Sequence, residues 1–219
     1  MAWELVILDC DGVLVDSEPL SNRILAERLT AIGLPTTTAD SMRLYMGRSW
    51  ASCVELIEER LGRPLPADFG EDYHAELFAA FTRELRPVPG VPEVLERLGA
   101  PACVASSGSH ERIRRALAAT GLLPRFEGRI FSAADVPRGK PAPDLFLHAA
   151  ERMGARPEAC AVVEDSPAGV QAARAAGMAV FGFARLTSAA SLEGSVVFEA
   201  MAELPALLSG CAPRSGGGP

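Results

Sequence analysis

The stretch Leu5-Val-Ile-Leu-Asp9-Cys10-Asp11-Gly12-Val13-Leu14-Val15-Asp16 determines how the rest of the chain is interpreted. Its first four residues are apolar and mostly branched, which predicts a buried strand. Asp9 and Asp11 end this strand, and because side chains alternate along an extended chain, both carboxylates should leave on the same side. Ligands of open α/β sheets bind at the carboxyl ends of strands, so chemistry is expected there. Gly12 lets the backbone turn sharply.

The 219-residue chain is long enough for one large domain or for a core domain with a smaller second one. It has 28 acidic and 21 basic residues and no basic run, which argues against nucleic acid or an anionic membrane as a partner. Its five cysteines show no C-x-x-C spacing, so reduced core thiols are expected. No stretch approaches a membrane-spanning length, and the first residues show no basic region or cleavage site. We therefore expect a cytoplasmic protein.

Residues 17–86 carry helical patterns and no strand pattern. Apolar residues recur at helical intervals over residues 17–34, 42–61 and 71–85, and Gly62-Arg-Pro-Leu-Pro66 separates the last two. These residues predict a small helical unit inserted directly after the first strand.

Beyond the stiff segment 86–92, short apolar strands alternate with helices, a pattern typical of a parallel sheet. We expect strands over residues 102–105, 129–132, 160–163, 179–183 and 196–198, and helices over residues 93–98, 109–120, 144–153, 168–176 and 202–208. The expected architecture is α/β, with a core of residues 1–16 and 88–219 and a helical cap of residues 17–87. Paired connections allow hinge closure over the strand ends. Residues 215–219 are expected to form a disordered tail.

Polar groups also end the later strands. Ser106 precedes Ser107-Gly108-Ser109, whose amides lead into a helix N-terminus suited to an anion. Glu164 and Asp165 end another strand. Lys140, in the loop between them, is the only lysine in the chain, while the other 20 cationic side chains are arginine. This usage indicates that a compact ammonium is required at position 140.

Carboxylates from two strands, without soft ligands nearby, suit a hard divalent ion, most simply Mg²⁺. A hydroxyl, a lysine and a helix N-terminus complete a site for an anion. Together these groups indicate phosphoryl transfer through an aspartyl phosphate, in which metal and lysine offset the repulsion between a carboxylate nucleophile and an anionic substrate.

Four segments resemble, in order, the four motifs of the haloacid dehalogenase superfamily. They are Asp9-Cys-Asp-Gly-Val-Leu-Val-Asp-Ser-Glu18, Ser106, Lys140-Pro-Ala-Pro-Asp144 and Glu164-Asp-Ser-Pro-Ala-Gly169. The resemblance extends to about Gly177, and the position of the cap is similar to that of the helical-cap (subfamily I) phosphatase and β-phosphoglucomutase branch. It implies a Rossmann-like core with an inserted all-helical cap domain.

The resemblance also implies roles for individual residues. Asp9 would be the nucleophile and Asp11 the general acid/base. Asp9, the backbone carbonyl of Asp11 and Asp165 would hold Mg²⁺, with Glu164 ligating directly or through water. The phosphoryl group would be held by Ser106 and Lys140. Because the dehalogenases that name the superfamily lack a second Asp at the position of Asp11, carbon–halogen hydrolysis is disfavoured.

Each of these residues has an ordinary structural explanation when taken alone: the acids could cap helices, Ser106 could stabilise a turn and Lys140 could be a solvated charge. Their joint order favours the functional interpretation. Cys10 should point to the opposite side of the strand and pack in the core. His74, His110 and His148 show no ligand spacing and are expected to be surface or capping residues.

Arg48 and Trp50, in Tyr-Met-Gly-Arg-Ser-Trp, are the cap candidates. In related caps a glycine-containing loop reads the substrate, which implies that Arg48 binds a carboxylate or a second phosphate. A solvated Arg48 and a packed Trp50 form an equally open alternative. Asp16 and Ser17 could be hinge and cap groups or could line the site, and the hinge is favoured.

The leading functional hypothesis is a Mg²⁺-dependent phosphatase for a small phosphorylated metabolite, either a sugar phosphate or a sugar-acid phosphate. The alternative is a β-phosphoglucomutase-like isomerase. Against it, the cap His of those enzymes falls at Ser21 in this sequence; their cap Arg falls near Trp50, although Arg48 is close to that position. A third is a non-catalytic phosphometabolite-binding protein, disfavoured by the intact set of acids. The substrate and the oligomeric state are left open.

Overall fold

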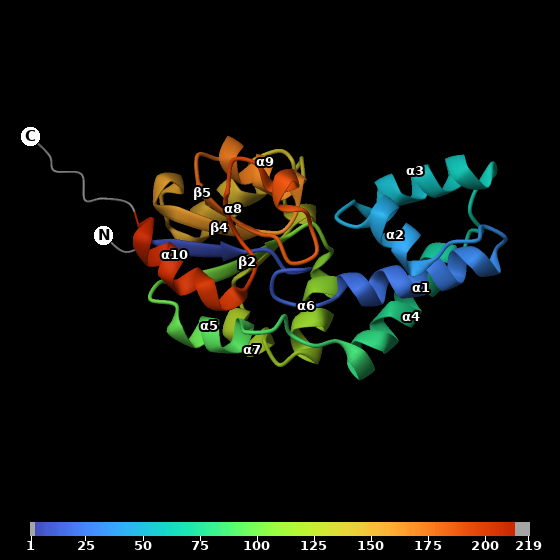
Figure 1. Cartoon of the computed structure of the whole chain (residues 1–219), viewed down its shortest axis with the longest axis horizontal. Helices are drawn as coiled ribbons and strands as arrows, with labels where there is room; N and C mark the ends of the chain where they lie inside the picture. The colour runs from blue at the N-terminus through green and yellow to red at the C-terminus, as the bar shows by residue number, and fades with distance from the viewer. Residues whose placement is uncertain (1–2, 213–219) are drawn as a thin grey trace, which may run out of the picture.

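The computed structural model describes residues 3–212, and within them a six-stranded sheet forms the centre of the molecule (Figure 1). The strands are β1 (Leu5–Leu8), β2 (Ala102–Ser106), β3 (Ile130–Ser132), β4 (Cys160–Glu164), β5 (Ala179–Phe183) and β6 (Val196–Phe198). They lie in the order β3-β2-β1-β4-β5-β6, and all neighbouring pairs are parallel. The carboxyl ends of β1, β2 and β4 therefore meet at one edge.

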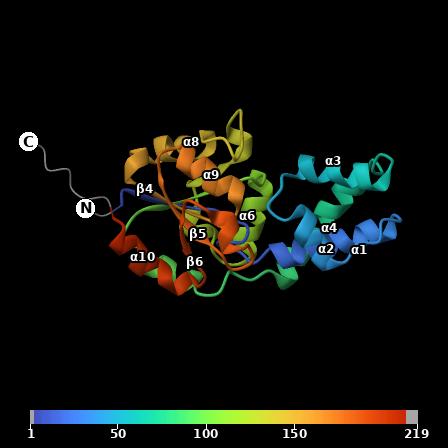
Figure 2. The same cartoon turned by 45° about the horizontal axis from the view of Figure 1, so that its top comes forward.

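Helices cover both faces of this sheet. Val6 and Leu8 pack into one apolar cluster with the helices α5 (Val91–Arg97), α6 (His110–Ala119), α7 (Leu123–Phe126) and α10 (Leu204–Gly210). Leu5 and Ile7 pack into a second cluster with α8 (Asp144–Met153) and α9 (Pro167–Ala175). Figure 2 shows α8 and α9 on the side of the strands opposite α10. Because both faces are covered, β1 is buried along its whole length and consists of apolar residues only.

Four further helices form a separate group at the carboxyl ends of the strands (Figure 1). We call this group the helical unit: α1 (Glu18–Ala31), α2 (Thr38–Tyr45), α3 (Trp50–Leu61) and α4 (Phe69–Glu84). The chain enters and leaves it side by side. The Asp16 N–H donates to the Arg86 carbonyl at 3.0 Å, and the Val88 N–H donates to the Leu14 carbonyl at 3.0 Å.

The α/β fold and its five expected later strands are confirmed. The helical pattern over residues 42–61 is divided between two helices, because α2 ends at Tyr45 and α3 begins at Trp50. Gly47, with φ +73°, occupies the left-handed region that ends the first helix. The start of α2 was also missed, although Thr37 and Asp40 form a capping box there. The four-residue α7 was not predicted.

The cysteines of the chain are free thiols, and four of them, Cys10, Cys53, Cys103 and Cys160, are buried as expected, whereas Cys211 is exposed. Within residues 3–212, no helix has the length and apolar character needed to cross a bilayer. The predicted tail, residues 215–219, lies outside the described residues.

Candidate active site

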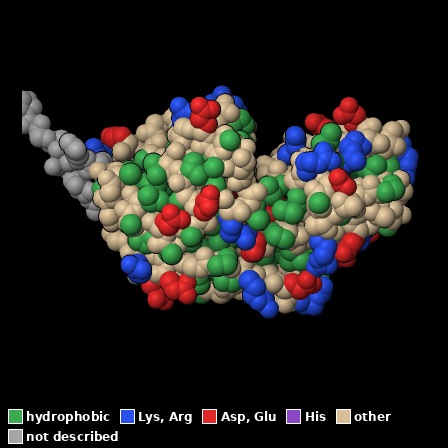
Figure 3. All heavy atoms as spheres, in the orientation of Figure 1, with side chains coloured by type: hydrophobic (Ala, Val, Ile, Leu, Met, Phe, Trp, Pro, Cys, Tyr) green, Lys and Arg blue, Asp and Glu red, His purple; other side chains and the backbone are tan. Residues whose placement is uncertain are grey.

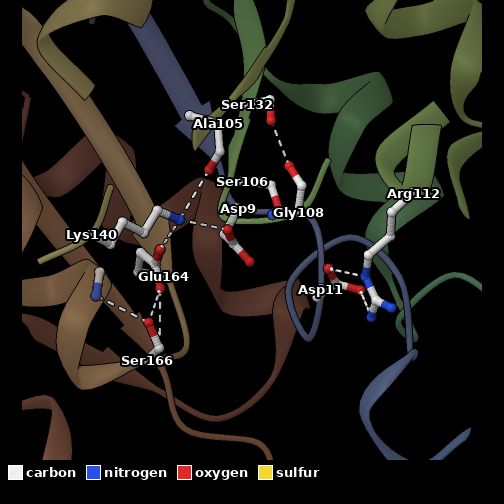
Figure 4. A network of polar contacts seen from close by, with 11 residues as sticks. Asp9, Asp11, Ala105, Ser106, Gly108, Arg112, Ser132, Lys140, Glu164 and Ser166 are labelled. Atoms are coloured by element: carbon white, nitrogen blue, oxygen red, sulfur yellow. Dashed lines mark hydrogen bonds and ion pairs between the residues drawn. The ribbon is translucent and has the colours of Figure 1, made fainter. Parts of the chain in front are cut away.

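Asp9 and Lys140 form a buried ion pair at the end of β1 (Figure 4). The Lys140 Nζ donates to Asp9 Oδ1 at 2.6 Å and to the Ala105 carbonyl at 3.0 Å, and it also donates to Glu164 Oε1. These three acceptors match the three donors of an ammonium group. The Lys140 side chain is 3% exposed, so the loop lysine is no solvated surface charge.

Lys140 binds its proton more strongly than Asp9 does. Burial raises the pKa of Asp9 to about 7, although the charge of Lys140 opposes that rise. Burial would lower the pKa of Lys140, but the charges of Asp9 and Glu164 outweigh it and raise that pKa above its ordinary value. Because the pKa of Lys140 stays far above that of Asp9, Lys140 is an ammonium at neutral pH, and Asp9 is the member of the pair that titrates there.

Glu164 connects Lys140 to the turn after β4. Its Oε2 accepts hydrogen bonds from the Ser166 N–H at 3.1 Å and the Ser166 hydroxyl at 2.9 Å, while Oε1 accepts from Lys140. Its side chain is 1% exposed. A Cβ on Gly169 would lie 1.9 Å from the Glu164 carboxyl carbon, so only glycine leaves room for this arrangement. Both oxygens of Glu164 are therefore occupied by donors of the protein itself.

Asp165 is the carboxylate without a partner. No hydrogen-bond donor of residues 3–212 reaches its oxygens, and a Cβ on Gly12 would lie 2.0 Å from Oδ2. Burial, together with the charges of Glu164 and Asp9, raises the pKa of Asp165 well above its ordinary value. An unpaired acid beside Asp9 is chemically suited to a divalent cation.

The carboxylates available for a metal are few. In the described part of the chain, no three His, Cys, Asp or Glu side chains surround a common metal position. Mg²⁺ in phosphoryl-transfer sites needs only one or two carboxylates, with substrate oxygens and waters as the remaining ligands. Asp9 and Asp165 fit this pattern, because both carboxylates line the same cavity.

Asp11 lies in the turn after β1 and faces a different partner from Asp9 (Figure 4). Arg112, on α6, donates from Nε to Asp11 Oδ2 at 3.1 Å and from Nη2 to Oδ1 at 2.9 Å. The Ser17 hydroxyl also donates to Oδ1. Burial alone would raise the pKa of Asp11, but the charge of Arg112 and these hydrogen bonds outweigh it and hold that pKa below its ordinary value.

Ser106 and the loop after it complete the core side of the site. The Ser106 Oγ accepts from the Gly108 N–H at 3.2 Å, and the Ser132 hydroxyl donates to the Gly108 carbonyl at 2.6 Å. Ser109 caps α6, because its side chain accepts from the Arg112 N–H. The loop is thereby fixed with the N-terminus of α6 facing the strand ends, a favourable environment for an anion.

A cavity of about 500 Å³ lies between these strand ends and the helical unit, and Figure 3 shows the notch between the two parts. From the core, it is lined by Asp9, Asp11, Ser106, Arg112, Lys140 and Asp165; from the helical unit, it is lined by Glu18, Arg48, Trp50, Tyr73, His74 and Phe78. All predicted site residues except Glu164 therefore line one cavity.

The two cap candidates differ in how they are held. Arg48 is exposed, and its Nε donates to the Leu44 carbonyl at 2.8 Å. Trp50 stacks on Tyr73 with ring centroids 5.0 Å apart and an interplanar angle of 4°. His74, expected at the surface, instead lies edge-on to Trp50 with centroids 5.0 Å apart. The wall facing the strand ends is therefore aromatic, with Arg48 at its margin.

Sequence reasoning did not single out Arg112, Glu18 or the hydroxyl of Ser17 as site groups. Arg112 is one of three arginines within four residues of α6, so spacing alone could not show which one faces inward. Glu18 is in the first turn of α1, where an acidic residue normally has a helix-capping explanation. For Ser17, the hinge was favoured over a place in the site.

Comparisons with known proteins agree with this geometry. The family model of haloacid dehalogenase-like hydrolases matches residues 3–177. A 6-phosphogluconate phosphatase of Escherichia coli is 33% identical over 82% of each chain, and a fructose-1-phosphate phosphatase of the same organism is 32% identical over 79% of this chain and 92% of that one.

A solved haloacid dehalogenase-like protein of unknown function from Agrobacterium tumefaciens superposes with a TM-score of 0.85 at 35% identity, covering 95% of this chain and 99% of that one. With a family model matched over most of its length, and with the sheet order and strand-end acids described above, this chain belongs to the haloacid dehalogenase-like hydrolases.

Proposed function

We propose that this enzyme is a Mg²⁺-dependent phosphatase that hydrolyses a small sugar phosphate or sugar-acid phosphate through an aspartyl phosphate on Asp9. The two phosphatases at 32–33% identity support the substrate class. The observation that carries the proposal is the meeting of Asp9, Lys140 and the unpaired Asp165 on the floor of one cavity.

Asp9 is the proposed nucleophile. Lys140 holds Oδ1, so Oδ2 is the oxygen left to form the bond to phosphorus. Once Asp11 has taken up a proton from solvent, it supplies that proton to the leaving oxygen, and the resulting Asp11 carboxylate takes a proton from the water that cleaves the aspartyl phosphate. Ser106, Lys140 and the amides before α6 bind the phosphoryl oxygens and stabilise their charge.

Asp9, the backbone carbonyl of Asp11 and Asp165 would hold the Mg²⁺. When bound, the ion neutralises charge on the phosphoryl oxygens and on the carboxylates around them. Glu164 contributes through a water at most while its oxygens remain on Lys140 and Ser166, and its main contribution is then to position Lys140.

We further propose that residues 17–87 act as a cap domain on a core of residues 1–16 and 88–219. Trp50 and Arg48 would face the part of the substrate that leaves, since both line the cavity from the helical unit. The free thiols favour a reducing compartment, which supports a cytoplasmic location for the enzyme.

The test is phosphate release from sugar phosphates, sugar-acid phosphates and nucleotides, with Mg²⁺ and with a chelator. We expect metal-dependent release that falls at least about 1,000-fold in Asp9→Asn. Asp68→Asn, an exposed aspartate before α4 without a side-chain capping bond, is the matched control and should keep full activity.

Two results would overturn the proposal. Release that persists in Asp9→Asn would exclude the aspartyl phosphate on this residue. Interconversion of hexose phosphates without release would establish an isomerase. Mass spectrometry of rapidly quenched protein should find a phosphate adduct on the peptide containing Asp9.

A further inference from the structure

The side chain of Arg112 lines the cavity, and several contacts hold its guanidinium group in one orientation. Only 17% of it is exposed. Besides its two bonds to Asp11, Nη2 lies 3.3 Å from the Ser21 hydroxyl of α1, and the guanidinium stands 5.4 Å from the ring centre of Phe81 on α4. Core and helical unit therefore hold it together, and its orientation does not depend on Asp11 alone.

The guanidinium group of Arg112 binds the carboxylate of Asp11. Nε and Nη2 approach the two oxygens of Asp11 at 3.1 and 2.9 Å, the parallel geometry in which arginine recognises carboxylates bidentately. In the free enzyme Asp11 thus occupies a finished carboxylate-binding position that opens into the cavity.

The pairing of Asp11 with Arg112 opposes the part that Asp11 takes in the proposed reaction. Its Oδ1 already accepts from Ser17 and Arg112, and its Oδ2 accepts from Arg112. An acid/base group must reach the leaving oxygen and then a water at hydrogen-bond distance. A protonated Asp11 carries no charge to pair with Arg112, so this bidentate pair opposes the acid/base role of Asp11, and a buried guanidinium left without an anion is costly.

We propose that Arg112 binds a carboxylate on the leaving group of the substrate, which takes the place of Asp11 and releases it for proton transfer. The inference rests on the proposed phosphatase function and narrows it to phosphorylated sugar acids. A neutral leaving group has no charge with which to replace Asp11 on Arg112. With such a substrate, Asp11 stays paired with Arg112 unless that ion pair breaks without compensation.

Arg112 is better placed than Arg48 for this task. Arg48 is exposed and donates through Nε to a backbone carbonyl, so its guanidinium is only partly available. Arg112 adjoins Asp11, and Asp11 must approach the oxygen that joins the phosphorus to the leaving group. The carboxylate that Arg112 selects therefore belongs to the leaving group and not to the transferred phosphate.

The test uses 6-phosphogluconate and glucitol 6-phosphate, which differ at the end remote from phosphate by a carboxylate in place of a hydroxymethyl group. We expect wild-type kcat/KM to favour the acid by about tenfold or more, because a site built for a polar group rejects an analogue lacking it. Arg112→Gln should bring that ratio to about one, and Arg112→Lys, which keeps the charge without the guanidinium group, should give an intermediate ratio.

Arg114→Gln is the matched control on the same helix. Arg114 is exposed and pairs with Glu127 away from the cavity, so its variant should keep the wild-type ratio. An equal fall in kcat/KM for both substrates in Arg112→Gln would overturn the inference, because it would show that Arg112 only positions Asp11.

Calorimetry on the wild-type protein covers the case in which Arg112→Gln does not fold. Gluconate should bind about tenfold or more tightly than glucitol, and equal binding would overturn the inference. Phosphate release without acid preference overturns only the role of Arg112. Tight gluconate binding without phosphate release from any substrate instead overturns the phosphatase function itself.

Discussion

At the scale of single residues, Gly169 matters because it has no side chain and so leaves room for Glu164, which holds Lys140. Gly169 faces the Glu164 carboxyl group, where a Cβ would overlap atoms at 1.9–2.2 Å. Glu164 in turn holds Lys140, which is paired with Asp9. A buried ion pair of this kind tolerates little displacement, because moving one partner leaves the other charge uncompensated.

We therefore expect Gly169→Ala to lower phosphate release at least about 100-fold and to lower the free energy of unfolding by about 2–3 kcal/mol. Phosphate assays and urea denaturation measure the two effects. Gly99→Ala is the control, since no atom lies within 4 Å of its added Cβ. An active and stable Gly169→Ala protein would show that Glu164 does not need its present position.

Glu18 provides a prediction on pH. Burial and the charge of Asp11 raise its pKa to about 7, although Arg112 and Asn22 oppose that rise. Between pH 4.5 and 7 the folded state then binds more protons at Glu18 than the unfolded state, so stability falls as pH rises through this window. Glu18→Gln carries no charge at any pH and avoids this loss.

With a chelator present, the free energy of unfolding of Glu18→Gln should therefore exceed that of wild type at pH 8 by on the order of 2–3 kcal/mol, which raises the urea midpoint. Near pH 4.5 the two proteins should have similar free energies of unfolding. Urea midpoints at both pH values test this. The exposed Glu59, changed to Gln, should shift neither midpoint by more than about 0.5 kcal/mol. A stability difference that is the same at both pH values would contradict the role of the Glu18 charge.

At the scale of elements, the strands were predictable and the helix boundaries less so. An apolar run between polar punctuation has few alternatives to a buried strand, which explains why β5 and β6 match the expected residues. The apolar stripe over residues 42–61 continues through two helices, and the left-handed turn at Gly47 does not interrupt that stripe. The spacing of apolar residues shows which face of a helix is buried, but it does not show whether the chain turns between two helices.

The same distinction applies to the site. Ser106 is the last residue of β2, and Asp9 and Asp165 directly follow β1 and β4, so the sheet itself places them. Arg112 and Glu18 enter the cavity because α6 and α1 pack at particular angles against the sheet and against α4, which no short sequence pattern specifies. The roles suggested for the predicted residues remain predictions until the variants are assayed.

The capping box at the start of α2 gives a prediction for an element. The Thr37 hydroxyl donates to Asp40 Oδ2 at 2.6 Å, and its oxygen accepts from the Asp40 N–H at 3.0 Å. Thr37→Ala should lower the free energy of unfolding by about 1 kcal/mol and leave phosphate release within about twofold. Thr82→Ala, whose hydroxyl bonds a carbonyl inside α4, should change stability less. Equal losses in the two variants would exclude a special role for the cap.

At the scale of the whole molecule, two adjacent connections join the helical unit to the core. Beside them, Arg185 in the loop after β5 pairs with Asp16 at the entrance to the helical unit. Arg112 and Phe81 form a second contact between the two parts. Such paired connections permit a hinge motion, and the cavity between the parts is the space that the motion would close.

The two tryptophans allow this motion to be observed. Trp50 lines the cavity from the helical unit, whereas Trp3 is buried at the opposite end of the sheet, with its indole N–H on the Leu208 carbonyl at 2.8 Å. Closure around a ligand removes water from Trp50 and leaves Trp3 unchanged. Adding 6-phosphogluconate to Asp9→Asn should therefore shift the tryptophan emission to shorter wavelength.

The shift should persist in Asp9→Asn/Trp3→Phe, where Trp50 is the remaining reporter, and should disappear in Asp9→Asn/Trp50→Phe. Calorimetry on both double variants must still detect binding, so that a lost signal reflects the missing reporter. A saturable emission shift in the protein that retains only Trp3 would place the structural change at the far end of the sheet. Closure of the helical unit over the strand ends would then be the wrong description of how this molecule responds to its ligand.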